Sequence, residues 1–503
     1  MKKLLCIILA LAMMISIASI TVASADIGDE VTIAVMDKGR VAETEGTMEE
    51  NRWTTWMREQ TGLNLKWMSL PRNGFRDAIG ELVAIGDAPD IIVEFDQTFF
   101  ANMASEGLII PLDDVLEEYA PNYYKFLQEN DDIKNATTFY DGHIYALTSF
   151  SGTKLSEVIW LRQDWLDQLG LSQPTSTEEL IEVARAFKEA KIGGEDTIPI
   201  VLNSWQLGGV FGLFQAEKDG WYVDENGKVE FGPLTDRFKG AVTFLKTLYD
   251  EGLIMRDYPT DTDLTLQKQL WINGQAGILL EYWYGTLNKD LLTNNPEANI
   301  QPLAPITTEF GENSYVQGTG LNYFVAINKD CKNVEGALKY LDWMFSTGWE
   351  VMSYGLEGVH YNIEDGKRVA VDDDDLKAQI RYTPLYAALA QEEPADKELM
   401  DNALPDEISQ KVALLGVQSY NMLIDTKYRK DIPQNPDVEE FNNYYAEWTV
   451  SFEPLVTKAI TAGASYTPDM LTDELRSIWE GAGGAEIVEK VQAWYDANKI
   501  NWQ

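Results

Sequence analysis

Residues 159–180 read IWLRQDWLDQLGLSQPTSTEEL and carry the signals that decide the fold. Residues 159–162 predict a short strand, and residues 164–169 predict a helix that ends at Gly170. The spacing Thr175-x-x-Glu178 then matches a capping box, which opens a second amphipathic helix through Phe187. A strand followed by helices is the repeating unit of an α/β sheet, so we expect an α/β protein.

The same alternation continues on both sides of this stretch. Before it, the pattern predicts strands at residues 31–35, 63–68 and 90–95, with helices at 49–60 and 75–85 between them. After it, the pattern predicts a strand at 199–202, a hairpin at 222–231 turning at Asn226-Gly227, a helix at 237–251, a strand at 276–281 and a helix at 334–345. The first group predicts a mostly parallel sheet, and the chain from about residue 372 onward predicts amphipathic helices.

Four passages, taken in order, resemble the extracellular solute-binding proteins of family 1, which serve sugar ABC transporters. They are AIGELVAIGDAPDIIVEFD (78–96), LRQDWLDQLGL with PTSTEEL (161–180), INKDCKNVEGALKYLDWMFST (327–347) and SYGLEGVHYNIEDGK (353–367). The last passage is similar to the large branch of about 500 residues that binds oligosaccharides, as LplA-type lipoproteins and alginate-oligosaccharide-binding proteins do. The resemblance covers nearly the whole chain after residue 25.

This resemblance implies a two-lobed periplasmic-binding-protein type II fold with a cleft between the lobes and a helical C-terminal elaboration. It places residues 26–148 and 318–360 in an N-terminal lobe, and residues 149–317 and 361–503 in a C-terminal lobe. It also implies a mechanism of binding without catalysis. An oligosaccharide enters the cleft, stabilises a hinge-closed form and is delivered to an ABC transporter permease.

Residues 1–25 have the pattern of an export signal. Lys2 and Lys3 precede an apolar run over residues 4–20, and Ala23-Ser24-Ala25 offers a cleavage site after Ala25. Cys6 would leave with this segment, and no lipobox cysteine stands at the cleavage point. We therefore expect an exported protein, periplasmic or associated with the cell surface, whose single remaining cysteine, Cys331, forms no internal disulfide.

The charge of the chain limits its partners. Removing Lys2 and Lys3 from 40 basic residues leaves 38 against 81 acidic residues, a net charge of −43. Nucleic acid is excluded because its phosphates would be repelled. The same argument favours a neutral oligosaccharide over an acidic one, although a local basic pocket would override the mean. The acidity also favours solubility outside the cell, and we expect a monomer.

Motifs for catalysis or metal binding are scarce. The chain has two histidines, His143 and His360, and no HExxH, GxSxG, P-loop or GxGxxG motif in a supporting context. The segments 224–227 and 372–375 suit a hairpin turn and a solvated acidic stretch better than a calcium loop, so we expect no metal and no cofactor. Two alternatives stay open: a secreted glycoside hydrolase that uses a carboxylate pair, and a binder of peptides or other solutes.

Aromatic residues after two predicted strands are candidate sugar platforms, because a Trp or Tyr ring covers the C–H face of a pyranose. Trp283 follows the strand at 276–281 and is the first candidate, with Tyr282 and Tyr284 as its alternatives. Trp205 and Gln206 follow the strand at 199–202. The carboxyl ends of strands in open α/β sheets are where ligands bind.

Polar candidates follow two strands of the first unit, where they would pair with sugar hydroxyls. They are Asp37 and Arg40 after the first strand, and Asp96 and Gln97 after the third, with helix capping as the other interpretation of Asp96. The resemblance adds Glu357, His360 and Tyr361 from the YGLEGVHY passage. Those three residues either line the cleft or pack a lobe hinge, and the sequence does not separate these roles.

Overall fold

The computed structural model describes residues 30–498, except residues 140, 152–156, 219, 262–263, 312–314, 316, 318–319, 365, 392–398, 401–405, 425–430, 433–435 and 437. The predicted export signal, residues 1–25, lies outside the described residues. Within them, no helix combines the length and the apolar character that crossing a membrane requires.

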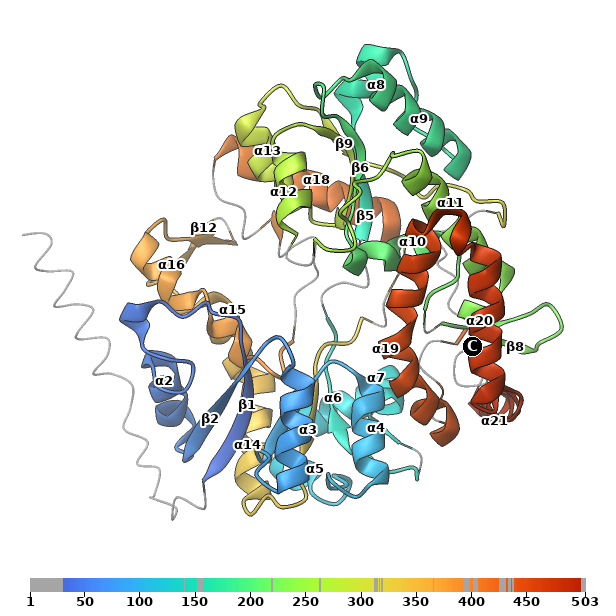
Figure 1. The fold of residues 1–503 in the computed structure, drawn as a ribbon. Coiled ribbons are helices and arrows are strands. Elements are labelled where there is room, and N and C mark those ends of the chain that lie inside the picture. Colours follow the sequence, from blue (N-terminus) through green and yellow to red (C-terminus); the bar gives the residue numbers. More distant parts are fainter. Residues whose placement is uncertain are drawn as a thin grey trace, which may run out of the picture.

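Two sheets organise the chain into two lobes (Figure 1). The first-lobe sheet has the strand order β2-β1-β3-β11-β4, and the second-lobe sheet has the order β10-β5-β9-β6. The first sheet consists of β1 (Val31–Asp37), β2 (Leu65–Pro71), β3 (Ile91–Glu94), β4 (Ala146–Leu147) and β11 (Phe324–Ile327). The second consists of β5 (Glu157–Arg162), β6 (Ile198–Val201), β9 (Ala276–Tyr282) and β10 (Ile300–Pro302).

The first sheet is parallel where consecutive α/β units built it and antiparallel where the chain returns. Strand β1 pairs in parallel with β2 and β3, as the sequence predicts. Strand β11 comes back from the second lobe and pairs antiparallel with β3 and β4. The helices of this lobe are α2 (Arg52–Thr61), α3 (Phe75–Ile85), α4 (Gln97–Ser105), α5 (Leu116–Tyr119), α6 (Pro121–Glu129), α7 (Asp131–Thr137), α14 (Val334–Trp343), α15 (Trp349–Tyr354) and α16 (Asp374–Ile380).

The deciding stretch folds largely as predicted. Strand β5 leads directly into α8 (Gln163–Leu169), which ends at Gly170 in the left-handed conformation with φ +67°. The predicted capping box is wrong by one residue. Ser176 is the N-cap of α9 (Thr177–Ala190) and accepts the N–H of Glu179, whose own carboxylate accepts the N–H of Thr175 at 2.7 Å. The reciprocal carboxylate therefore comes from Glu179 and not from Glu178.

Separate hydrophobic cores define the extent of each lobe. One core takes its residues from the second sheet and from helices near the C-terminus, whereas two others lie on opposite faces of the first sheet. Tyr382, Tyr386 and the run Ala387–Ala390 belong to a first-lobe core. The first lobe therefore continues past the boundary that we placed at residue 360 and includes the described chain through Ala390.

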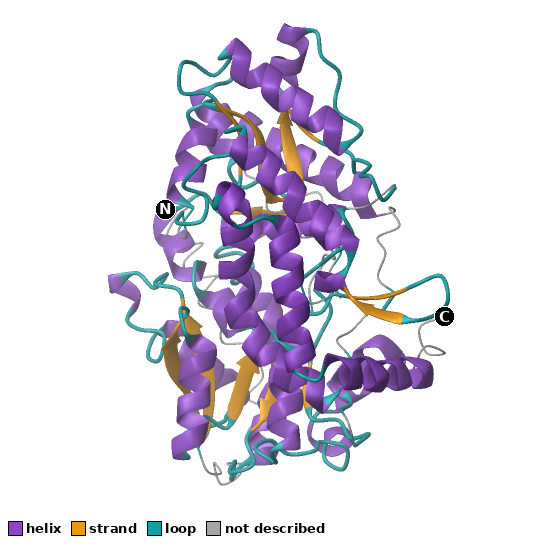
Figure 2. Cartoon of the chain, turned by 45° about the vertical axis from the view of Figure 1, so that its right-hand side comes forward, coloured by secondary structure: helices purple, strands orange, loops and turns teal. Residues whose placement is uncertain are grey.

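The remaining helices cover the second lobe (Figure 1). They are α10 (Leu207–Leu213), α11 (Asp236–Asp250), α12 (Thr265–Ile272), α13 (Asn288–Asn294), α18 (Glu407–Ile424), α19 (Glu439–Thr461), α20 (Pro468–Gly481) and α21 (Gly484–Asn498). The hairpin of β7 (Trp221–Val223) and β8 (Val229–Phe231) extends beside the C-terminal helices (Figure 2). Phe231 stacks on Trp479 with ring centroids 5.0 Å apart, which ties this hairpin to the helical elaboration.

A buried carboxylate joins two helices of the first lobe. Asp342 on α14 accepts hydrogen bonds from the N–H of Tyr123 at 2.8 Å and from Asn122 at 2.7 Å, both in the first turn of α6. The N-cap residue of α6, Ala120, makes no side-chain cap hydrogen bond. Asp342 thus supplies the missing cap from a neighbouring helix, and its charge favours the helix N-terminus.

Replacing Asp342 with alanine should lower the free energy of unfolding by about 2–3 kcal/mol, because a buried N–H loses its acceptor. Asp342→Asn keeps one oxygen as acceptor and should cost about 1 kcal/mol. Urea denaturation followed by circular dichroism measures both. An alanine variant within about 0.5 kcal/mol of the unchanged protein would contradict this role.

Candidate functional site

Each sheet presents one end of its strands to the other lobe. We call this end of the strands, with the residues that directly follow or precede them, the edge of the lobe. In the first lobe, β3 ends and β11 begins at the same edge, because Phe324 pairs with Glu94 in antiparallel register. In the second lobe, β9 ends where β5 begins, because Tyr282 pairs with Glu157. The chain crosses between these edges after β4 and again before β11. The residues that follow β1, β3 and β9 therefore face the space between the lobes.

Electrostatic interactions connect the edges across that space. Burial raises the pKa of the Tyr282 hydroxyl, Glu157 adds to the rise, and the Arg72 guanidinium of the first lobe opposes it. Burial acts against the charge of Arg76, but Asp96 and Glu94 outweigh it and hold the pKa of this guanidinium above its usual value. Arg72, directly after β2, and Arg76, in the first turn of α3, thus bring cations to this part of the edge.

A stacked aromatic pair with one exposed ring lies at the first-lobe edge. Phe95, directly after β3, stacks on Tyr323, directly before β11, with ring centroids 3.9 Å apart. The Phe95 side chain is 54% exposed, which is unusual for a phenylalanine. An exposed apolar ring at a lobe edge is a surface on which the C–H face of a sugar can stack.

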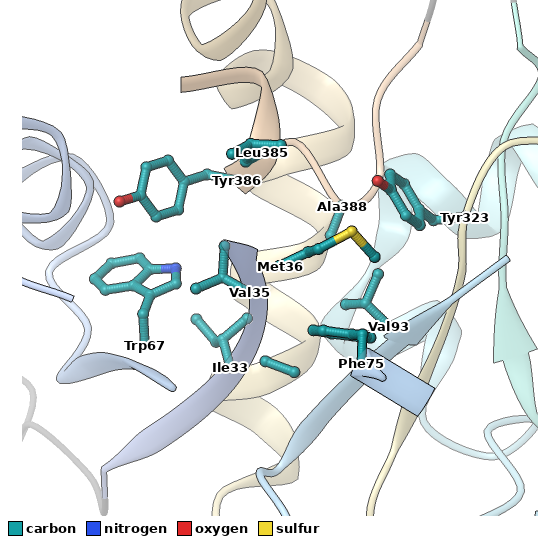
Figure 3. A pocket seen from close by; sticks show the side chains of 11 residues that line it. Ile33, Val35, Met36, Trp67, Phe75, Val93, Tyr323, Leu385, Tyr386 and Ala388 are labelled. Carbon is teal, nitrogen blue, oxygen red and sulfur yellow. The ribbon is translucent and has the colours of Figure 1, made fainter. Parts of the chain in front are cut away.

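A small cavity beside this pair is too small to hold a sugar. Figure 3 shows side chains of β1 and β3 pointing toward it from one side and Leu385, Tyr386 and Ala388 lying on the other. Its volume is about 20 Å³, which is room for about one water molecule. It is a packing gap between the sheet and the segment that continues the first lobe beyond residue 360.

A second aromatic pair lies at the second-lobe edge. The rings of Tyr282 and Tyr284 are parallel within 1°, with centroids 5.5 Å apart, and are 45% and 36% exposed. Trp283 between them is 5% exposed and packs against Tyr420 of α18. The indole of Trp283 is therefore buried against the second lobe and does not face the cleft as expected, because the chain turns directly after β9, with the N–H of Gly285 donating to the carbonyl of Tyr282 at 2.9 Å. The exposed rings at this position are those of Tyr282 and Tyr284.

A buried carboxylate supports the turn that carries these tyrosines. Glu281 is 5% exposed, and burial raises the pKa of its carboxyl to about 7. Thr286 and Leu287, which follow the turn, act on this pKa in the opposite direction.

The predicted polar residues of the first lobe lie at its edge, and three of the four already make hydrogen bonds or an ion pair within the protein. Asp96 caps α4, as its other interpretation held, and pairs with Arg76. Gln97 donates to the carbonyl of Ala136 at 2.9 Å. Asp37 accepts the N–H of Gly39 at 2.7 Å, and the exposed Arg40 lines an open pocket.

Two candidate residues, Trp205 and Gln206, follow β6, and the structure describes the side chain of Gln206 alone. The side chain of Trp205 lies outside the described part of the structure. Gln206 is buried, and its Oε1 accepts from Gln267 at 2.6 Å. The structure therefore places Gln206 in a buried amide pair beneath the second-lobe edge.

The YGLEGVHY candidates lie in the first lobe, away from the paired aromatic rings. His360 is buried against Trp53, with ring centroids 5.6 Å apart, and its Nδ1 accepts the N–H of Leu356. Tyr361 is buried as well and starts the hairpin of β12 (Tyr361–Glu364) and β13 (Lys367–Ala370), whereas Glu357 is exposed. For His360 and Tyr361 the structure favours the packing role.

The sequence-based candidates omit three residues at the edges: Lys38, Arg72 and Tyr323. Tyr323 precedes an antiparallel strand, so recognising it required the direction of β11. Arg72 follows β2, which continues to Pro71 and not to residue 68 as predicted. In an antiparallel strand the residue before the strand lies at the same end of the sheet as the residue after its neighbour, and this is the signal that identifies Tyr323.

Comparisons with known proteins agree with this architecture. A family model described as bacterial extracellular solute-binding protein matches residues 41–351. The fructooligosaccharide ABC transporter substrate-binding protein FusA of Streptococcus pneumoniae is 25% identical over 77% of this chain and 73% of its own length. The polygalacturonan/rhamnogalacturonan-binding protein YtcQ of Bacillus subtilis is 26% identical over 66% of this chain and 67% of its own.

Solved structures share the two-lobed fold. FusA in complex with kestose superposes with a TM-score of 0.72 at 19% identity, covering 94% of this chain and 100% of that one. The alginate-binding protein AlgQ2, solved without calcium ion, gives a TM-score of 0.71 at 21% identity over 93% and 99% of the two chains.

Replacing Glu281 with glutamine should change how stability depends on pH. A folded pKa of about 7, above the ordinary glutamate pKa of 4.5 in the unfolded chain, means that the proton bound to Glu281 stabilises the fold and that this contribution is fully present below about pH 4.5. That contribution is lost as the pH rises through 7. Between about pH 5 and about pH 8 the unchanged protein should therefore lose about 2 kcal/mol relative to Glu281→Gln.

Thermal and urea denaturation at both pH values measure this difference. Glu225→Gln, at an exposed hairpin position, is the matched control and should follow the unchanged protein. Parallel stability curves for the unchanged protein and Glu281→Gln would contradict the assignment.

Proposed function

Because the chain belongs to the bacterial extracellular solute-binding protein family, we propose that it is the extracytoplasmic receptor of an ABC importer and binds an oligosaccharide between its lobes. The observation that carries this proposal is the presence of stacked aromatic pairs at both facing edges, Phe95–Tyr323, of which Phe95 is exposed, and Tyr282–Tyr284, of which both rings are exposed. Known relatives support it, since FusA is a fructooligosaccharide receptor and YtcQ a polygalacturonan/rhamnogalacturonan-binding protein.

The two-lobed architecture supports binding by closure. Each lobe has its own hydrophobic core, so one lobe can rotate relative to the other without disrupting either core. A sugar that contacts both aromatic pairs gains more interaction free energy in the closed form than in the open one. This difference in affinity is what drives closure.

Several properties complete the proposal. Residues 1–25 direct export and are removed after Ala25, the receptor acts as a monomer, and the closed form docks on a membrane permease. The receptor binds its ligand without converting it. Two features of the protein act in opposite directions on the choice of ligand: the net charge of −43 that remains without Lys2 and Lys3 favours a neutral sugar, whereas cations at the first-lobe edge favour an acidic one.

A thermal-shift screen of residues 26–503 tests the function. The ligands are neutral, amino and acidic oligosaccharides and di- to pentapeptides, since a ligand that binds only the folded state raises the melting temperature. A shift with oligosaccharides that chromatography recovers intact supports the receptor. Consumption of a sugar would support the glycoside hydrolase alternative, and shifts with peptides alone would support a peptide receptor.

Replacing Tyr282 or Tyr284 with alanine should weaken binding of the oligosaccharide that gives the largest shift by about tenfold, because a stacking ring is lost. Isothermal titration calorimetry measures this change. Met470→Ala is the matched control, since Met470 is 46% exposed on α20 and lies outside both edges. Unchanged affinity in both tyrosine variants would show that this pair is not a platform.

A further inference from the structure

The first-lobe edge carries a group of cations in an otherwise strongly acidic protein. Lys38 follows β1, Arg40 lies two residues further along the chain, and Arg72 follows β2. The chain has 40 lysines and arginines against 81 aspartates and glutamates, so a local surplus of positive charge is unexpected. Among the described residues, these three side chains make no ion pair, whereas nearby Arg76 is paired with Asp96.

Strand pairing holds two of these cations side by side. Asp37 and Pro71 are partners in the parallel register of β1 and β2, so Lys38 and Arg72 are the next residues on adjacent chains. The N–H of Arg72 donates to the carbonyl of Asp37 at 3.0 Å, which continues the pairing beyond the strands. Burial lowers the pKa of Lys38, and the charges of Arg72 and Arg40 lower it further. Like charges repel in the unliganded state, and an anion between them would relieve the repulsion.

An open pocket extends the cationic surface along the same chain segment. It measures about 540 Å³ and is lined by residues 39–42 together with α16 and the residue that follows it. Arg40, Lys377 and Arg381 contribute cations to this lining, and Asp374 is its single carboxylate. Lys377 is neutralised by Asp372 and Asp374, which leaves Arg40 and Arg381 to face the pocket. The volume lies within the range of about 300–1,000 Å³ typical of small-ligand sites.

The position of Arg72 relates these cations to the aromatic pairs. Arg72 follows β2 at the end of the first sheet, and its charge lowers the pKa of the Tyr282 hydroxyl of the opposite lobe against the larger rise caused by burial and Glu157. The facing second-lobe edge instead carries a carboxylate, Glu157, in register with Tyr282. The first-lobe edge also carries two carboxylates, Asp37 at the end of β1 and Asp96, which is paired with Arg76, so its positive charge is local to Lys38, Arg40 and Arg72. An anionic ligand would turn its charges toward the first lobe and its hydroxyls toward Glu157.

We propose that the bound oligosaccharide is acidic, and that Lys38, Arg40 and Arg72 receive the carboxylates of its uronic acid units. This inference rests on the proposed function and specifies its ligand class. Each arginine presents a planar fork that can donate two parallel hydrogen bonds to a carboxylate such as that of a uronic acid unit. The acidity of the rest of the protein does not prevent binding, because charges more than about 8 Å away are screened at physiological ionic strength. The cationic edge thus outweighs the net charge that favours a neutral sugar.

Calorimetric titration of residues 26–503 with matched ligand pairs tests the proposal. The probes are the trimers and tetramers of galacturonate, glucuronate and mannuronate, each compared with its fully methyl-esterified form, which has the same sugar units without charge. We expect at least one acid to bind about tenfold or more tightly than its ester. Raising the salt from about 0.05 M to about 0.5 M should weaken binding of the acid and leave the ester unaffected.

Matched variants locate the carboxylate contacts. Arg72→Gln should weaken binding of the acid by about tenfold and leave binding of the ester nearly unchanged. Lys125→Gln removes the same charge from an exposed position on α6 of the same lobe and should alter neither. Both positions are exposed, so neither change disturbs a core.

The outcomes separate this inference from the proposed function. Equal affinity for acid and ester, an Arg72→Gln variant that binds the acid normally, or binding restricted to neutral or sulfated oligosaccharides would each overturn the acidic ligand, while leaving an oligosaccharide receptor in place. Failure of every oligosaccharide, charged or neutral, to bind would overturn the proposed function itself.

Discussion

The antiparallel pairing of β11 with β3 is the constraint on which the rest of the structure depends. The chain leaves the first lobe after β4, builds the second lobe and returns as β11 beside β3, with Phe324 opposite Glu94. This pairing places the start of β11 at the edge where β1 and β3 end, so the chain leaves and returns on one side of the sheet. The corresponding pairing of β5 with β9 does the same for the second lobe. Two edges that face each other, with loops at both, follow from these two registers.

The residues at these edges are held in place by the cores but are not part of them. Phe95 and Tyr323 emerge from neighbouring antiparallel strands and stack, while Tyr282 and Tyr284 emerge on one side of a chain whose intervening residue, Trp283, is packed in the core. Stacking between neighbouring rings orders these surfaces before any ligand arrives, which lowers the entropy cost of binding. The register of β1 and β2, in which Asp37 pairs with Pro71, places the cations Lys38 and Arg72 side by side. Aromatic faces and charges are thus arranged by strand pairing.

The sequence predicted elements whose patterns are local and missed features that depend on distant contacts. Helix α3 spans residues 75–85, as its apolar spacing predicts, and β5, α8 and the hairpin turn at Gly227 follow from neighbouring residues. The position of Trp283 after a strand predicts that its indole faces the cleft, but the turn that follows β9 directs the indole into the second lobe. The lobe boundary was placed at residue 360, whereas Tyr382 and Tyr386 complete a first-lobe core through contacts with residues more than 300 positions away, such as Glu45 and Asn51. The sequence candidates omit Arg72 because the apolar pattern predicts a strand that ends at residue 68, whereas β2 continues to Pro71.

The measurement that tests the two-lobed receptor most directly is small-angle X-ray scattering of residues 26–503, alone and saturated with the oligosaccharide that stabilises the fold most. Closure of the lobes around the ligand predicts a smaller radius of gyration and a shorter maximum dimension in the saturated sample. A saturated sample whose scattering profile matches that of the free protein would contradict the account, since binding would then occur without bringing the two edges together.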